Sequence, residues 1–163
     1  MNPAQVAAFR ARIVSGQATL EAAYRENRDG NALLHGRSAL LDGVLNDIWL
    51  ALALPAEIAL IAVGGYGAGR MFPYSDVDLL ILCDDATTPE TQGSIETLIG
   101  LLWDIGLDLG HSVRTTQECL DTAEHDITVQ TALLEARLIT GNEKIFREFQ
   151  QKFRARQIGR AHV

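Results

Sequence analysis

The sequence predicts an α/β fold (α+β) in which a small sheet is flanked by helices, and two kinds of segment lead to that prediction. Two short apolar runs, 58–63 and 77–82, are bounded by glycine, proline or serine, a pattern typical of buried strands. Longer segments on either side carry apolar residues at helical spacing. A stretch at 106–114 is expected to supply a third strand.

The composition is that of an ordinary globular chain. Its 163 residues suffice for one domain with a substantial core, and 47% of them are apolar while 21% are charged. Cys83 and Cys119 are far apart in the chain, and we expect both to be small apolar core residues. The formal net charge of −7 argues against broad, non-specific nucleic-acid binding. An acidic protein can still bind a small nucleotide when a magnesium ion neutralises both, so the charge favours a small-nucleotide partner over nucleic acid, and we expect no nucleic acid.

The N-terminal third is predicted to be helical. Residues 1–28 and 32–52 carry apolar residues near helical spacing, with a candidate interruption at 15–16. We interpret 1–55 as a helical N-terminal extension. The chain opens without the apolar stretch of a secretory signal, and its longest apolar run, 48–54, is too short to span a membrane. These features predict a cytoplasmic protein with no membrane partner.

A glycine-rich loop at 64–69 joins the first strand to the second. Gly64 and Gly65 allow backbone N–H groups to approach a polyphosphate closely, because no Cβ intervenes. A turn that leads into a helix also suits phosphate binding, so we expect a short helix around 66–71. The loop is not a dinucleotide fingerprint, because no βαβ unit follows, and it is not a P-loop, because Gly-Lys-Ser/Thr is missing.

Two carboxylates mark the entry to the second strand. Because side chains alternate along a strand, Asp76 and Asp78 are expected to point to one face while Val77 points into the core. Their Cα atoms would lie about 6–7 Å apart, a spacing at which two carboxylates can share divalent cations. Either motif alone is usually an ordinary turn or a solvated strand end. Together they predict a site for phosphoryl or nucleotidyl transfer.

The later helices are predicted from periodicity and capping. A helix at 91–105 has an apolar stripe that includes Trp103, which we expect in the core. A capping box at 115–118 opens a short helix, and further helices are expected at 127–140 and 143–156. The strand expected at 106–114 lies between the helix at 91–105 and the capping box at 115–118. In this strand, Asp108 would share one face with Gly110 and Ser112.

The central stretch resembles a known superfamily. Gly64-Gly65 followed by Ser75-Asp76-Val77-Asp78 is similar to the glycine turn and carboxylate pair of the DNA polymerase β-like nucleotidyltransferases. More narrowly, the string from Gly64 to Leu80 resembles the family of bifunctional uridylyltransferase/uridylyl-removing enzymes that modify the PII signal protein. The resemblance extends over about residues 30–150 and includes the segments 102–104, 110–115 and 135–138.

The glycine loop departs from that family at one place. The family usually has Gly-Arg-Gly-Glu where this chain has Gly67-Ala68-Gly69-Arg70. The arginine has moved by two positions, and the acidic residue is missing. We therefore assign Arg70 no role from the resemblance.

The resemblance implies a metal-dependent nucleotidyltransferase with a small mixed sheet. Its reaction would transfer UMP from UTP to a tyrosine of the PII protein and release pyrophosphate. Asp76 and Asp78 would hold Mg²⁺ or Mn²⁺ and act in catalysis. Asp108 would complete the metal's ligands or deprotonate the attacking hydroxyl, unless it is an edge-strand aspartate in water. The nucleotide would be bound by Gly64, Gly65 and Ser75.

Two other functions stay open at this point. Another protein nucleotidyltransferase, such as an adenylyltransferase, would need the same site. A nucleotide-binding module without turnover would result if truncation had removed helices that close the site. Uridylyl removal and glutamine sensing depend on further domains in the family, and we expect neither activity from these 163 residues.

The domain boundaries follow from these segments. We interpret residues 56–157 as the nucleotidyltransferase domain, incomplete at its C-terminal end. Residues 158–163 match one translated frame of a common sequencing-adaptor oligonucleotide, so we interpret them as a non-native tail.

Overall fold

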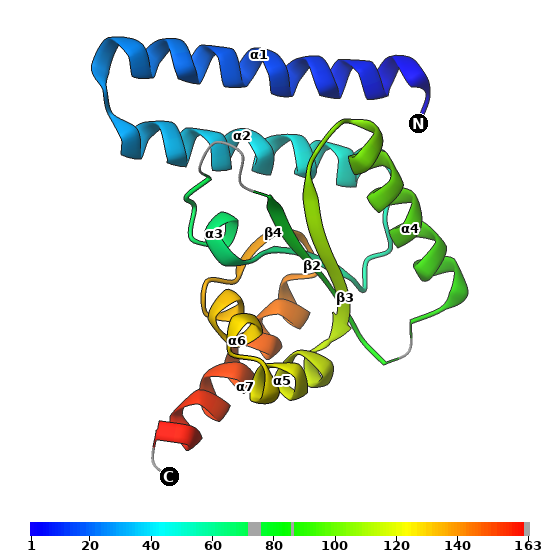
Figure 1. The fold of residues 1–163 in the computed structure, drawn as a ribbon. Coiled ribbons are helices and arrows are strands. Elements are labelled where there is room, and N and C mark those ends of the chain that lie inside the picture. The colour runs from blue at the N-terminus through cyan, green and yellow to red at the C-terminus, as the bar shows by residue number, and fades with distance from the viewer. Residues whose placement is uncertain (72–75, 86, 162–163) are drawn as a thin grey trace.

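The computed structural model describes residues 1–71, 76–85 and 87–161, which form a mixed sheet between two layers of helices (Figure 1). The strand order is β3-β2-β1-β4, with β2 parallel to β3 and β1 antiparallel to both of its neighbours. This arrangement confirms the predicted α/β fold with a small mixed sheet. The strands are β1 (Ala59–Ala62), β2 (Val77–Cys83), β3 (Leu109–Thr115) and β4 (Arg137–Gly141).

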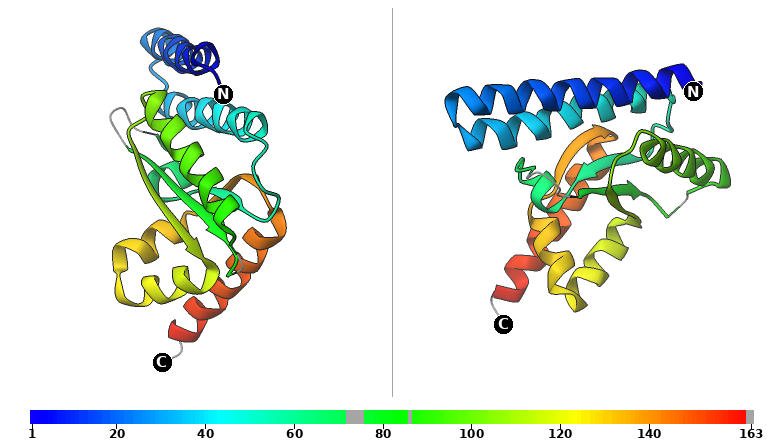
Figure 2. Two further views of the ribbon diagram at one scale, coloured as in Figure 1. Left: turned by 90° about the vertical axis from the view of Figure 1, so that its right-hand side faces the viewer. Right: turned by 45° about the horizontal axis from the view of Figure 1, so that its top comes forward.

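Helices cover both faces of the sheet (Figures 1 and 2). One face is covered by α1 (Pro3–Asn27), α2 (Gly30–Ala51) and α4 (Pro89–Asp104). The other face is covered by α5 (Thr116–His125), α6 (Ile127–Leu134) and α7 (Glu143–Ala161). The single turn α3 (Gly64–Gly67) follows β1 directly. Figure 2 shows the two N-terminal helices stacked at one end of the molecule and the C-terminus at the opposite end.

The strand β2 connects the two cores because its apolar residues alternate between them. Leu79 and Ile81 pack with residues of α2 and α4, whereas Leu80 and Leu82 pack with residues of α5 and α7. A strand buried on both faces has a continuous apolar run rather than an alternating one. The alternation places Asp78 on the same face as Leu80, towards α5, α6 and α7.

The N-terminal hairpin contains no break at 15–16, so the candidate interruption is wrong. Gly16 lies inside α1, and a Cβ built on it would lie 2.7 Å from the side chain of Leu40 in α2. The glycine therefore permits close helix packing instead of ending the helix. The N-terminus of α1 is fixed by a capping box between Asn2 and Gln5.

Two predictions for the later helices had different outcomes. The capping box at Thr115 and Glu118 is confirmed, with both reciprocal hydrogen bonds present at the start of α5. The core position of Trp103 is wrong, because its side chain is 50% exposed. Trp103 lies one step beyond the buried stripe of α4 and faces water, while Leu102 beside it is fully buried.

The largest correction concerns the segment expected to be one helix at 127–140. α6 ends at Leu134, and Arg137–Gly141 forms the strand β4. Without β4, one edge of the fully buried strand β1 would leave backbone N–H and C=O groups unpaired. This pairing is a long-range effect, so it leaves no sign in the local apolar spacing. The sheet therefore has four described strands instead of the three predicted.

The ends of the chain and the cysteines complete the fold. Cys83 and Cys119 are both free and buried, as expected. α7 continues past the expected end at 156 to Ala161. The boundary between 1–55 and 56–157 and the non-native origin of 158–163 stay predictions. Among the described residues, no helix is both long and apolar enough to cross a membrane.

Candidate functional site

Asp78 is the carboxylate at the centre of the site. It occupies the second position of β2 and is half-buried, while Val77 before it is 4% exposed and belongs to the core. The opposite burial of these neighbours agrees with the alternation predicted for a strand. Asp78 therefore projects from a rigid, central strand rather than from a loop.

Two glycines leave the space that the Asp78 carboxylate fills. A Cβ built on Gly64, at the start of α3, would lie 3.3 Å from Asp78 Oδ2. A Cβ built on Gly110, in β3, would lie 2.8 Å from Asp78 Oδ1. Gly64 also has a φ of +61°, which L side chains adopt only with strain. The predicted glycine turn and the predicted carboxylate thus lie side by side.

Asp76 and Asp108 lie at the same end of the two parallel strands. The register pairs Val77 with Leu109, and the Val77 N–H donates to the Asp108 carbonyl at 2.9 Å. Both aspartates are exposed and directly precede their strands. Asp108 lines a cavity on the α1 and α2 face, not the cavities that Asp78 lines. The structure therefore brings Asp78 to the glycine turn but does not bring Asp108 there.

The electrostatics of the carboxylate pair fit a divalent cation. Burial raises the pKa of the Asp78 carboxyl above its ordinary value, and the negative charge of Asp76 raises it further. Within the described residues, neither aspartate forms an ion pair with a basic side chain. Across the same residues, no group of three or more His, Cys, Asp or Glu is arranged to hold a metal. The carboxylates of Asp76 and Asp78, which form no ion pair with a described basic side chain, are nevertheless suitable oxygen ligands for Mg²⁺.

A cavity of about 620 Å³ opens between the glycine turn and α6. Its floor includes Asp78, and its volume is in the range of small-molecule sites. α3 and its following loop line one side, and α6 with its C-cap lines the other. The lining residues on these two sides are Gly64, Gly65, Ala68 and Arg70, and Ile127, Thr128, Thr131, Ala132 and Glu135.

The predicted nucleotide-binding residues have different outcomes. Gly64 and Gly65 both line this cavity, and α3 begins at Gly64, two residues earlier than expected. Ser75 lies outside the described residues. Arg70, to which the resemblance gave no role, is exposed and lines the cavity, with its N–H donating to the Gly65 carbonyl at 3.0 Å. The positively charged residue Arg70 therefore lies beside the glycine turn.

A second, smaller cavity of about 290 Å³ lies on the other side of Asp78. It is lined by Gly110, Ser112 and Arg114 of β3, and it shares Asp78, Thr128 and Ala132 with the first cavity. Sequence reasoning did not identify Gly110 as a site residue. Gly110 lies two positions after Asp108 and begins the segment 110–115 of the family resemblance, but its place beside Asp78 depends on the register of two strands.

Comparison with known proteins gives a family match over the central part of the chain. Residues 45–130 match a family model described as a nucleotidyltransferase domain. This range includes the glycine turn and all three candidate carboxylates. A solved structure described as the crystal structure of a toxin-antitoxin with AMP-PNP overlaps with a TM-score of 0.43 and 17% identity, over 71% of this chain and 87% of that chain.

Curated relatives match almost the whole chain but only part of their own length. Three are described as bifunctional uridylyltransferase/uridylyl-removing enzymes. The one from Aromatoleum aromaticum is 47% identical over 93% of this chain, and the one from Nitrosospira multiformis is 49% identical over 88%. The one from Burkholderia mallei is 41% identical over 94%. The chain spans 17–18% of the length of these relatives.

Proposed function

This chain belongs to the nucleotidyltransferase domain family, and on that premise we propose that it transfers UMP from UTP to a tyrosine of the PII signal protein. The observation that carries the proposal is the close approach of the Asp78 carboxylate to Gly64, where a side chain would crowd it, at a cavity of about 620 Å³ that both residues line. The identity of 41–49% to uridylyltransferases supports the choice of UTP and PII. Magnesium as cofactor and the cytoplasm as location are part of this proposal.

The candidate carboxylates and glycines each have a role in the proposed reaction. Asp76 and Asp78 would hold Mg²⁺, which when bound neutralises phosphate charge and lowers the pKa of the attacking hydroxyl. The backbone N–H groups of Gly64 and Gly65 would donate to the triphosphate at the start of α3. Asp108 stays the predicted third carboxylate. Its position at the same strand ends as Asp76 supports that role, although its cavity is a different one.

The orientation of these groups explains how the fold would assist the transfer. In-line attack on the α-phosphorus asks for little covalent chemistry from the protein, so positioning and charge stabilisation dominate. Asp78 lies in the inner strand β2, and Gly64 and Gly110 leave the space that its carboxylate fills, so we expect the carboxylate to need little reorganisation. Arg70 in the cavity wall supplies a positive charge near the expected phosphates.

The test is labelling of purified PII protein with radiolabelled UTP and magnesium. The Asp76→Asn, Asp78→Asn double variant should lose at least about a thousandfold in rate, because metal charge stabilisation is worth several kcal/mol. Asp85→Asn is the matched control, since Asp85 is an exposed aspartate at the other end of β2. Equal labelling by wild type and double variant would refute the site assignment.

A nucleotide-binding module without turnover is the second candidate function. The observation that favours it is the altered loop, whose residues Ala68 and Arg70 line the cavity beside Asp78. Magnesium-dependent UTP binding without labelled PII would support this candidate against the enzyme. Replacing UTP by ATP in the same assay tests the adenylyltransferase alternative, which predicts labelling with ATP only.

A further inference from the structure

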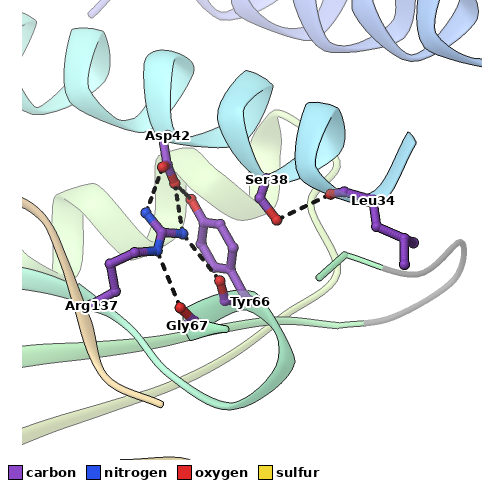
Figure 3. A network of polar contacts seen from close by, with 6 residues as sticks. All are labelled: Leu34, Ser38, Asp42, Tyr66, Gly67 and Arg137. Carbon is purple, nitrogen blue, oxygen red and sulfur yellow. Dashed lines mark hydrogen bonds and ion pairs between the residues drawn. The ribbon is translucent and has the colours of Figure 1, made fainter. Parts of the chain in front are cut away.

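Three side chains from separate elements meet behind the glycine turn (Figure 3). Tyr66, in α3, donates its hydroxyl to Asp42 Oδ1 of α2 at 2.6 Å. Arg137, the first residue of β4, donates from Nη1 to Asp42 Oδ2 at 2.6 Å and from Nη2 to Oδ1 at 3.3 Å. Asp42 therefore accepts hydrogen bonds from both partners and is an ion-pair partner of Arg137.

The guanidinium of Arg137 also contacts the backbone of α3. Its Nε donates to the Gly67 carbonyl at 3.2 Å, and its Nη2 donates to the Tyr66 carbonyl at 3.1 Å. The guanidinium carbon lies 5.4 Å from the centre of the Tyr66 ring, within the range of a cation–π contact. The planar guanidinium of Arg137 thus connects α2, α3 and β4. A lysine ammonium cannot donate hydrogen bonds in these several fixed directions.

Burial differs among the three side chains, because those of Asp42 and Arg137 are 32% and 33% exposed whereas Tyr66 is buried. Tyr66 is 1% exposed, and burial raises the pKa of its hydroxyl far above the ordinary value, with the Asp42 hydrogen bond adding to the effect. Tyr66 therefore stays a proton donor at any physiological pH. A Cβ built on Gly67 would lie 2.1 Å from the Glu135 carbonyl oxygen, so α3 packs directly on backbone at this point.

The two ends of α3 have different surroundings. Tyr66 and Gly67, at its C-terminal end, are held by Arg137 and by backbone contact. Gly64 and Gly65, at its N-terminal end, line the cavity of about 620 Å³, and Asp42, Tyr66 and Arg137 do not. The three side chains can therefore act on a ligand only through the position of α3.

We propose that Asp42, Tyr66 and Arg137 are positioning residues that hold the glycine turn in the orientation in which it binds a nucleoside triphosphate. The proposal rests on the proposed function, and it adds residues from α2 and β4 that lie on either side of the family match at 45–130. Without the network, the turn would populate its binding-competent position for only a fraction of the time. Apparent affinity falls in proportion to that fraction.

The experiment compares Arg137→Lys with a matched control, Arg156→Lys. Arg156 pairs with Glu124 at 2.6 Å with side-chain exposures of 32% and 37%, close to the 33% and 32% of the Arg137–Asp42 pair. Arg156 lies in α7 and lines neither of the two cavities beside Asp78. Both variants keep the positive charge, so only the forked geometry is removed.

Three readouts separate positioning from general destabilisation. Arg137→Lys should raise the dissociation constant of UTP with magnesium, measured by calorimetry, by about tenfold. With PII present, KM should rise by about the same factor while kcat at saturating UTP changes by less than about twofold, because saturating nucleotide restores the ordered turn. A partly unfolded sample would instead lower kcat and leave KM unchanged. In the free protein, hydrogen exchange at the Gly67 and Ala68 amides should accelerate.

The outcomes distinguish this inference from the proposed function. Unchanged exchange at Gly67 and Ala68, unchanged UTP affinity in Arg137→Lys, or equal effects in Arg156→Lys would each overturn the positioning role. If wild-type protein fails to bind UTP with magnesium although exchange accelerates in the variant, the proposed function is overturned and the nucleotide role of the network with it.

Discussion

Asp78 is placed where an ionised carboxylate is unfavourable in the metal-free protein. It is half-buried, it lies beside Asp76, and its carboxylate fits between Gly64 and Gly110. Burial and the neighbouring charge both raise the pKa of Asp78, and burial has the larger effect. A cation bound at this carboxylate would relieve both effects, so one residue connects metal binding to stability.

Asp78→Asn should stabilise the metal-free protein at neutral pH. The raised pKa means that the folded state binds the Asp78 proton more tightly than the unfolded state, so stability falls as pH rises through the acidic range. The gain should be about 1 kcal/mol or less, because solvent screens a half-exposed carboxylate, and it corresponds to a rise in Tm of about 2 °C. Calorimetric melting at pH 7 in EDTA measures it.

The pH dependence supplies the control for this prediction. The gain should shrink as pH falls and vanish below the ordinary pKa of an aspartate, where Asp78 is protonated in both states. Asp85→Asn should show no comparable dependence, since Asp85 is exposed at the far end of β2. A stabilisation of Asp78→Asn that persists unchanged at low pH would contradict the electrostatic cause.

Sequence spacing predicts positions that depend on near neighbours in the chain. Asp76 and Asp78 follow from strand alternation, and Gly64 follows from the turn that its positive φ confirms. Gly110, Gly67 and Arg137 lie in segments of the family resemblance but were given no site role, because each contacts a residue far away in the sequence. Gly110 lies next to Asp78 only because β3 pairs with β2 in this register. Arg137 contacts α3 only because β4 joins the sheet.

At the scale of elements, α3 depends on its contact with the segment between α6 and β4. Gly67 approaches two backbone carbonyls, since a Cβ there would lie 2.1 Å from Glu135 O and 2.8 Å from Ala62 O. Backbone atoms cannot rotate away as a flexible side chain can. The position of the glycine turn is therefore fixed by main-chain packing as well as by Arg137.

Gly67→Ala should destabilise the protein by about 1–3 kcal/mol, the usual cost of overpacking a closely packed position. Gly100→Ala is the matched control, because Gly100 is also helical and a Cβ there meets nothing within 4 Å. The control should gain up to about 1 kcal/mol from the higher helix propensity of alanine. Urea unfolding of both variants gives the two free energies. Equal stability of Gly67→Ala and wild type would show that α3 does not pack as described.

The elements themselves were predicted unevenly for a related reason. Helices with local caps, such as α5, and strands bounded by glycine and serine were identified close to their observed limits. β4 was assigned to a helix because Leu133, Leu134, Leu138 and Ile139 have a spacing that suits a helix as well. Only the unpaired edge of β1 requires a strand there, and that requirement exists in the assembled sheet alone.

At the scale of the whole molecule, the site is assembled from both halves of the chain. β2 supplies Asp78, the β1–α3 junction supplies Gly64, α6 supplies the opposite wall, and α2 and β4 hold the turn from behind. These elements span residues 30–141. Nucleotide binding should therefore stabilise the global fold rather than one loop, because no single element contains the site.

This linkage gives a prediction for the intact protein. A ligand that binds only the folded state adds about 2.7 kcal/mol at a concentration of one hundred times its dissociation constant. For a domain of this size, that free energy corresponds to a rise in Tm of about 5–10 °C. UTP with magnesium should produce this rise in wild-type protein, and UTP with EDTA should not. Asp78→Asn should lose most of this rise in Tm, although it is the more stable protein without ligand.

Two outcomes would show that UTP binds elsewhere: a rise in Tm that does not need magnesium, or an equal rise in Asp78→Asn. The reason is that only a site that includes the Asp78 carboxylate couples the binding of metal and nucleotide to the stability of the fold.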